Sequence, residues 1–243
     1  MRRRAAGVDG DFPAGTFRFL QTPDTARSSP RHGLYTGVET RINNAGGSAL
    51  RTNGPNLPSG GETVMGAMSG FAVDDIDGGN FTFAPGAFAD HLTSFAADFN
   101  NGAQTKMSRW ISKGAVGTYG AVEEPCNYPG KFPTANMHAM YFDGLTLGEA
   151  CLRALAAVPF QGMMLGDPLC RPFAHIPVVT PTGLPVVPVS GNFTFTPIAT
   201  TTHPTATIAR FEVYVDAFSA PPRAPARRSS SAPGTTTTAG TRS

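Results

Sequence analysis

Residues 78–99, "GGNFTFAPGAFADHLTSFAADF", predict a strand followed directly by a helix. Phe81 and Phe83 alternate with polar residues, which is typical of a half-buried strand, and Pro85 is expected to end it. A helix would then begin near Gly86. Its apolar side chains recur at helical spacing on one face: Phe88, Leu92, Phe95 and Phe99. The stretch therefore indicates one unit of an α/β fold.

Strand and helix patterns alternate on both sides of this stretch. Strands are expected within residues 15–22, 48–58, 115–119, 137–144 and 161–168, and helices within 32–45, 103–114 and 146–158. Residues 22–31 are expected to form a polar loop, and residues 62–72 suit either a buried strand or a short helix. Thr146 and Glu149 form a capping-box pattern. Residues 12–173 therefore predict an α/β domain of the Rossmann-like type, with a mostly parallel sheet flanked by helices.

The composition changes after this domain. Residues 174–218 are rich in Val, Thr and Pro, and Phe211, Val213 and Val215 alternate with polar residues. Two to four strands of an immunoglobulin-like β-sandwich are expected there, which is fewer than the seven of a complete sandwich. Residues 1–11 and the Ser/Thr/Pro-rich tail 219–243 have little apolar content and are expected to be disordered.

Composition narrows the classes of partner. A net charge of +2, with several arginines at the two ends of the chain, argues against a nucleic-acid partner. No apolar run is long enough to span a membrane. The three cysteines cannot all pair within one chain, so a disulfide scaffold is not expected. No secretory signal is visible after Arg2–Arg4, and a secreted or cell-surface location is expected only if the full-length protein carries one.

The predicted sheet indicates where binding residues lie, because ligands of an open α/β sheet bind beyond the carboxyl ends of its strands. Four loops lie at predicted strand ends: 22–27, 84–94, 118–127 and 166–170. Gly86 would open a helix whose free N–H groups attract an anion. The binding candidates in these loops are Asp24, Arg27, Gly86, Asp90, Ser94, Tyr119 and Asp167. A protein or peptide is the expected kind of ligand.

The catalytic candidates are His91, Glu124 and Cys126. His91 and Ser94 would share a helix face, although such a histidine more commonly bonds a neighbouring loop. The two glutamates before Cys126 would raise its thiol pKa, so the cysteine is expected to pack, and Glu124 is the better general base. Metal-ligand spacing and a phosphate-binding glycine loop are absent from the sequence, so no metal or cofactor is expected. A carboxylate site for Mg²⁺ or Ca²⁺, built from Asp24, Asp90, Glu124 and Asp167, is a weaker alternative.

Five runs of sequence resemble, in this order, a bacterial protein family of uncharacterised function. They are "TFRFLQTPDTARS" (16–28), "FAPGAFADHLTSF" (83–95), "GAVGTYGAVEEPCNYPGKFP" (114–133), "LTLGEACLRALA" (145–156) and "QGMMLGDPLCRPF" (161–173). The resemblance covers residues 12–173 and implies no particular activity.

The runs "LTLGEACLRAL" and "MMLGDPLCRPF", with the Val/Thr-rich segment after them, resemble more distantly the gingipain-type cysteine peptidases of the caspase-like α/β fold. In those peptidases the nucleophilic cysteine follows a strand before a helix, and the catalytic histidine follows an earlier strand in a His-Gly pair. The matching strand end here reads Ala84-Pro85-Gly86, and His32-Gly33 opens a helix. The resemblance therefore implies a caspase-like domain that is incomplete at its N-terminus and degenerate in its catalytic residues.

Two functions follow from these observations. The first is a non-catalytic caspase-like domain with a binding or cell-surface role. The alternative is a peptidase-like hydrolase whose site is made of His91, Glu124 and Cys126. Thiol–imidazole chemistry distinguishes them, because it needs a cysteine and a histidine within hydrogen-bond reach.

Overall fold

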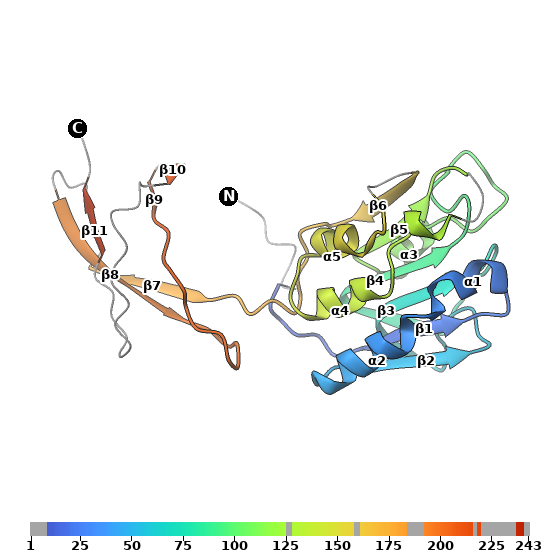
Figure 1. The fold of residues 1–243 in the computed structure, drawn as a ribbon, viewed down its shortest axis with the longest axis horizontal. Helices are drawn as coiled ribbons and strands as arrows, with labels where there is room; N and C mark the ends of the chain where they lie inside the picture. The colour runs from blue at the N-terminus through green and yellow to red at the C-terminus, as the bar shows by residue number, and fades with distance from the viewer. Residues whose placement is uncertain are drawn as a thin grey trace. The chain divides into compact units, whose positions relative to one another are not determined.

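The structure is a computed structural model that describes residues 9–124, 128–157, 161–183, 192–215, 218–219 and 237–240. The chain forms two compact units, the first ending at Ala174 and the second beginning at His175. The first unit carries a six-stranded sheet and every helix that the described residues form (Figure 1).

A six-stranded sheet in the order β2-β1-β3-β4-β5-β6 forms the centre of the first unit. Strands β1 to β5 run parallel, and β6 runs antiparallel to β5. The strands are β1 (Thr16–Gln21), β2 (Ala49–Asn53), β3 (Glu62–Gly70), β4 (Phe81–Leu92), β5 (Gly117–Ala121) and β6 (Gly162–Gly166). The prediction of a mostly parallel sheet flanked by helices is confirmed.

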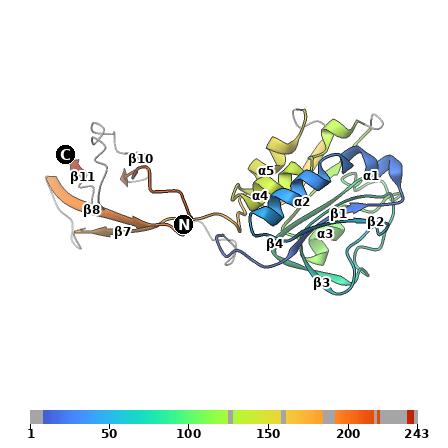
Figure 2. The same cartoon turned by 60° about the horizontal axis from the view of Figure 1, so that its bottom comes forward.

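Helices cover both faces of this sheet unequally (Figure 2). One face, called here the helix-rich face, carries α1 (Thr25–His32), α2 (Tyr35–Asn44), α4 (Asn136–Phe142) and α5 (Leu147–Ala154). The other face, called the α3 face, carries α3 (Ser108–Lys113). A short 3-10 helix, η1 (Pro129–Lys131), precedes α4.

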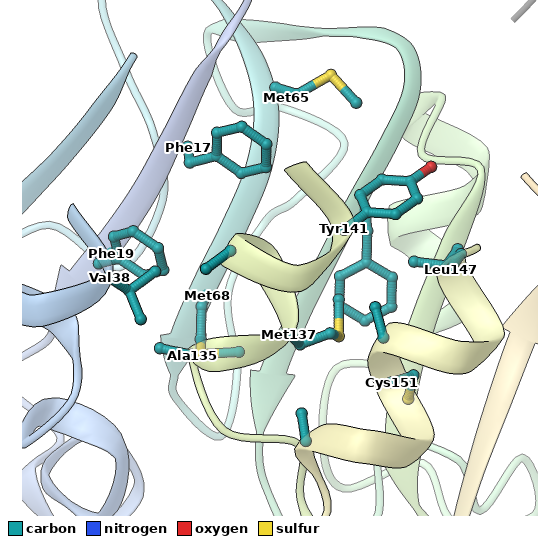
Figure 3. Close-up of a cluster of buried hydrophobic side chains, with 14 of the residues drawn as sticks. Phe17, Phe19, Val38, Met65, Met68, Ala135, Met137, Tyr141, Leu147 and Cys151 are labelled. Atoms are coloured by element: carbon teal, nitrogen blue, oxygen red, sulfur yellow. The ribbon is translucent and has the colours of Figure 1, made fainter. Parts of the chain in front are cut away.

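The hydrophobic core is split by the sheet into two layers. Figure 3 shows the layer on the helix-rich face, where Phe17 and Met68 of the sheet meet Met137, Leu147 and other side chains of α4 and α5. The layer on the α3 face is smaller and packs around Trp110. Buried layers on both faces explain why the central strands read as apolar runs in the sequence.

Several predicted elements are confirmed. The strand expected in 15–22 is β1, the helix expected in 32–45 is α2, and residues 62–72 contain a strand, β3. The helix α3 ends at Gly114, whose φ of 114° suits a left-handed cap. The capping box of α5 is complete, because Thr146 Oγ1 accepts from the Glu149 amide while Glu149 accepts from the Thr146 amide.

The helix predicted from Gly86 is wrong, because β4 continues as one strand to Leu92. Gly86 has a φ of 85°, and it lies where the pairing jumps from Val64↔Phe83 to Gly66↔Phe88. Residues 84–87 therefore bulge from the ladder without ending it, which the flexible glycine permits. His91 and Ser94 consequently share no helix face.

Two other elements differ from prediction. Residues 137–144, expected to be extended, lie mostly in α4, and this helix buries Met137, His138, Ala139 and Tyr141. A helix buried on so many sides lacks the one-sided pattern that reveals helices in sequence. Residues 22–31, expected to be a loop, contain most of α1.

The second unit is small and β-rich. Strands β7 (Val178–Thr182), β8 (Asn192–Thr200) and β11 (Thr237–Gly240) form one antiparallel sheet in the order β11-β8-β7, and β9 (Tyr214–Val215) pairs with β10 (Phe218–Ser219). A strand is predicted around Phe211, Val213 and Val215, but in the structure only Tyr214–Val215 of this segment forms one. Thr237–Gly240 lies in the tail expected to be disordered, yet it pairs with β8.

At the other end of the chain, part of the expected disordered start is bonded to the first unit. The amide of Gly10 donates to the carbonyl of Arg171, whose own amide donates to Asp9 Oδ1.

Within the described parts of the chain, no helix combines the length and the apolar character that a bilayer span would need.

Candidate functional site

The polar site begins where helix α1 crosses the carboxyl ends of β1 and β3. This is the point at which the strand order reverses, and ligands of such sheets commonly bind there. Here α1 fills the crevice: Thr22 Oγ1 donates to the Gly70 carbonyl, and a side chain at Gly70 would collide with the Arg27 carbonyl. The open space is therefore displaced to the side of α1 that faces the residues after β4.

A pocket of about 230 Å³ occupies that position. It is enclosed by α1, by the residues that end and follow β4, by Glu124, and by η1 with the residues next to it. Its lining residues are Ala26, Arg27, Pro30, Leu92, Thr93, Ser94, Glu124, Tyr128, Pro129, Lys131 and Phe132. Five of these residues are apolar, and the others carry hydroxyl groups, two cations and one carboxylate.

Arg27 is held in place by two neighbours. Its Nε donates to Thr93 Oγ1 at 3.0 Å, and its Nη1 lies 3.0 Å from Asp24 Oδ2. Thr93 is itself fixed, because its hydroxyl donates to Gln104 Oε1 at 2.8 Å. The guanidinium therefore has a fixed plane at the pocket wall, which is how arginine recognises planar anions.

Lys131 and Glu124 are the other charged residues of the pocket lining. The Lys131 side chain is only 2% exposed; its Nζ donates to the Glu123 carbonyl at 2.7 Å and lies 3.7 Å from Glu124 Oε2. Glu124 Oε2 is buried and has no hydrogen-bond partner among the described residues. Gln161 supports this loop, since its Nε2 donates to the Glu124 carbonyl at 3.0 Å. A buried acceptor without a donor is costly, which makes this oxygen a place for a ligand N–H.

An ion pair lies buried beside the pocket, under the helix-rich face. Arg31 Nη1 contacts both carboxylate oxygens of Asp90, at 3.0 and 2.7 Å, and Nη2 donates to the Ser69 carbonyl. Burial raises the pKa of Asp90, and the charge of Arg31 opposes this rise. Arg31 lies one turn after Arg27 on α1, and Asp90 lies three residues before Thr93. The pair therefore fixes the two elements that carry the pocket wall.

His91 points the other way, into the α3 face. Its Nδ1 accepts from Trp110 Nε1 at 2.9 Å, its Nε2 lies 3.1 Å from the Thr105 carbonyl, and its ring stacks on Phe71. Burial lowers the pKa of His91 to about 3, so the ring is neutral at physiological pH. Both nitrogens are engaged, and His91 does not line the pocket. The geometry gives it a structural contact and no proton to exchange with a ligand.

The other four histidines are also outside the pocket lining. His138 of α4 is fully buried against Phe17, Phe19 and Phe88, and burial lowers its pKa to about 3. His32 Nε2 contacts Ser28 Oγ, and His175 and His203 belong to the second unit. Within the first unit, no imidazole therefore lines the pocket.

The structure brings together only some of the predicted site residues. Arg27, Ser94 and Glu124 line the pocket, and Asp24 bonds Arg27. Asp90 and His91 are buried on opposite faces of β4. Cys126 lies outside the described residues. Sequence reasoning missed the other polar lining residues: Thr93, Tyr128 and Lys131.

Three further candidates are placed away from this pocket. Asp167 follows β6, and because β6 is antiparallel it lies at the amino end of β5, where its amide donates to the Val116 carbonyl. Gly86 lies in the bulge of β4, and its carbonyl accepts from the Tyr141 hydroxyl. The buried Tyr119 ring packs against Phe132, and burial raises the pKa of its hydroxyl. Asp167 was predicted at the ligand-binding edge of the sheet because the direction of β6 was not known from the sequence.

The metal-ligating and thiol side chains of the described residues are scattered or buried. Within the described ranges, no three His, Cys, Asp or Glu side chains gather closely enough to hold a metal ion. The four carboxylates considered for Mg²⁺ or Ca²⁺ are separated, because Asp90 is bonded to Arg31 and Asp167 lies at the other end of the sheet. Cys151 and Cys170 are buried free thiols, and burial raises the pKa of Cys151 to about 12. Neither thiol is therefore an activated nucleophile.

Comparison of the whole chain with protein-family models, with curated proteins and with solved structures gave no match in any of the three.

Proposed function

We propose that the first unit is a non-catalytic, caspase-like α/β domain that binds a small or peptidic ligand in the pocket beside α1. The observation that carries this proposal is the composition of the pocket: Arg27, Lys131 and Glu124 line it, and the three histidines of the first unit lie elsewhere in that unit. Fixed charges with apolar lining suit recognition. Acid–base catalysis by a histidine would need an imidazole at the pocket, and the remaining candidate base, Glu124, is held beside Lys131 with Nζ 3.7 Å from Oε2.

The hydrolase alternative depends on His91 as the partner of Cys126. His91 is fully buried, its nitrogens are bonded to Trp110 and Thr105, and its pKa is lowered to about 3. A thiol is activated by a nearby base or cation, and this imidazole serves neither purpose. The binding role is therefore the better supported of the two.

The caspase-like relationship belongs to the same proposal. It is supported by the order of parts: a mostly parallel sheet, a capped helix α5 before the final strand, and a β-rich unit after it. The Gly166-Asp167-Pro168 run after β6 agrees with the resemblance as well. A cell-surface setting is part of the proposal, because a binding domain with a β-rich appendage suits that role.

The pocket can be tested by blocking it. Isotope-labelled protein is titrated with a panel of small carboxylates, amines, amides and aromatic compounds, and backbone amide shifts are recorded by NMR. We expect shifts at Thr93, Ser94 and Phe132, and their loss in Ser94→Trp, whose indole would fill the pocket. Ser112→Trp, at an exposed position of α3, is the matched control and should keep the shifts.

Catalysis is tested in parallel with mixed fluorogenic peptides. We expect no hydrolysis by the wild-type chain above that of the Cys126→Ala variant. Hydrolysis that disappears in Cys126→Ala would overturn the binding proposal in favour of the hydrolase. Fragments that shift no lining residue, or shift them equally in Ser94→Trp, would show that the pocket is not a binding site.

A further inference from the structure

We infer that the pocket recognises an amino-acid residue with a free α-carboxylate and an apolar side chain, with Arg27 as the anchor of the carboxylate. This inference rests on the proposed binding function and names the ligand of the same site. The residue can come from a free amino acid or from the C-terminus of a peptide, and the second is the expected source. Four features of the pocket lead to this chemistry.

The first feature is the orientation of Arg27. Its Nε is bonded to Thr93 and its Nη1 to Asp24, while Nη2 makes no hydrogen bond to the described residues. These contacts remove much of the side-chain freedom that arginine would otherwise lose on binding. The fixed guanidinium can then present its remaining N–H groups to a carboxylate, a charge-assisted contact that is stronger than a neutral hydrogen bond.

The second feature is the balance of charge. The lining carries Arg27 and Lys131 against Glu124, so the lining residues sum to one positive charge. Asp24 beside Arg27 reduces the positive field further. A carboxylate, with a single negative charge, matches this balance. A phosphate, with nearly two negative charges, would meet the repulsion of Glu124.

The third feature is the buried oxygen of Glu124. Oε2 has no hydrogen-bond donor among the described residues, although Lys131 Nζ is 3.7 Å away. An N–H group of the ligand would satisfy it and remove the cost of leaving it unpaired. The α-nitrogen of an amino-acid residue is such a donor, whether as an amide N–H or as an ammonium group. Because it is attached to the same carbon as the carboxylate, one residue carries both of the groups that Arg27 and Glu124 would bind.

The fourth feature is size and apolar lining. About 230 Å³ is smaller than a typical drug-sized pocket. One amino-acid residue fits this volume better than a longer segment does. Leu92, Pro30 and Phe132 supply apolar lining for its side chain, and Tyr128 adds a half-exposed ring at the pocket.

The experiment compares ligands that differ only at the two polar ends. N-acetyl-leucine, N-acetyl-leucinamide, free leucine and acetyl-Ala-Leu are titrated into the full chain by calorimetry. We expect N-acetyl-leucine to bind about tenfold or more tightly than its amide, since a hydrogen bond to a charged group has about that worth. Acetyl-Ala-Leu should bind at least as tightly as free leucine. The reverse order of these two would assign the carboxylate to free amino acids and would overturn the expected source.

Variants of Arg27 test the anchor. Arg27→Ala should abolish the preference for acid over amide, and Arg27→Lys should keep only part of it, because an ammonium group lacks the planar pair of donors. Arg109→Ala removes an exposed arginine on α3 and is the matched control. Equal affinity for acid and amide, or an unchanged preference in Arg27→Ala, would overturn the inference. The proposed binding function would survive that result as long as Ser94→Trp still abolishes the fragment shifts.

Discussion

Asp90 and His91 are neighbours on β4, yet the molecule buries them in opposite ways. Asp90 enters the helix-rich face, where Arg31 matches its charge with two contacts. His91 enters the α3 face, where Trp110 and Thr105 hold the ring in its neutral form. Side chains alternate between the faces of a strand, so one residue of sequence separates a buried charge from a buried neutral ring.

The burial of both side chains explains why the carboxyl end of β4 is rich in polar residues that do not face the pocket. A buried polar group must be paired or neutral, and both residues meet this condition within the protein. The polar groups left for a ligand come after the strand, at Thr93 and Ser94, and from α1 and the Glu124 loop. A cluster of polar side chains at a strand end therefore indicates a ligand-binding site only when the polar groups point into open space.

The largest expected effect comes from breaking the buried ion pair. Asp90→Ala leaves the Arg31 charge buried without its partner, because these side chains are 0% and 3% exposed. We expect the free energy of unfolding to fall by about 3–5 kcal/mol, measured by chemical denaturation. The fold of the pocket wall should loosen with it, since the pair joins α1 to β4.

The control for this prediction removes both partners. Arg31→Met combined with Asp90→Leu replaces the pair by apolar groups and should recover most of the lost stability. A loss below about 1 kcal/mol in Asp90→Ala would contradict the idea that the pair holds the two elements. A double variant as unstable as the single one would show that the shape of the site matters more than its charge.

A smaller effect is expected from protonation of the buried histidines. The pKa values of His91 and His138 are lowered from 6.5 to about 3 by burial. The unfolded chain therefore binds these protons at a higher pH than the folded chain does. The stability that the two neutral rings contribute is complete above pH 6.5 and is lost as the pH falls toward 3, with a slope of at most about 1.4 kcal/mol per pH unit for each ring.

Leucine substitutions separate the two rings, since the other titrating groups cancel in the comparison with wild type. His138→Leu should reduce the acid slope by one histidine at little cost near pH 7, because the imidazole nitrogens of His138 have no hydrogen-bond partner among the described residues. His91→Leu should reduce the slope equally but cost about 1–3 kcal/mol at pH 7, since Trp110 Nε1 loses its acceptor. Equal losses in the free energy of unfolding at pH 7 for the two variants would contradict the expected difference between the hydrogen-bonded ring of His91 and the unbonded ring of His138.

The fold was largely predictable where local signals agree with tertiary packing. Strand β1 and helix α2 show clear periodicity, and the Thr146–Glu149 capping box marks the start of α5 in the sequence itself. Strand β4 was misread because Pro85-Gly86 resembles a strand end followed by a helix start. The structure uses the positive φ of Gly86 for a bulge, and the pairing with β3 resumes at Phe88. Such pairing is a non-local interaction that residues 78–99 do not reveal.

The site was predictable only in part, for a related reason. Because α4 was read as extended and the sheet was expected to be mostly parallel, the antiparallel direction of β6 was missed. This error placed Asp167 at the wrong end of the sheet. Arg27, Ser94 and Glu124 were found because they follow strands whose direction was right. Lys131 was missed, since only its burial beside Glu124 distinguishes it from an ordinary surface lysine.

The smallest expected effect concerns a second ion pair, on the α3 face. Arg109 Nη1 lies 2.8 Å from Asp77 Oδ2, about as close as Arg31 lies to Asp90, but the Arg109 and Asp77 side chains are 59% and 46% exposed. Water screens such a pair and the long side chain loses freedom in forming it, so Arg109→Ala should change the free energy of unfolding by only about 0.2–1 kcal/mol in denaturation experiments. The effect should shrink further in high salt, whereas that of Asp90→Ala should persist, because salt screens buried charges far less.

Similar losses for the two variants would mean that distance and not burial sets the strength of ion pairs in this fold. A small, salt-sensitive loss also qualifies Arg109→Ala as the control for Arg27, since any change in ligand preference could not then come from general loss of stability.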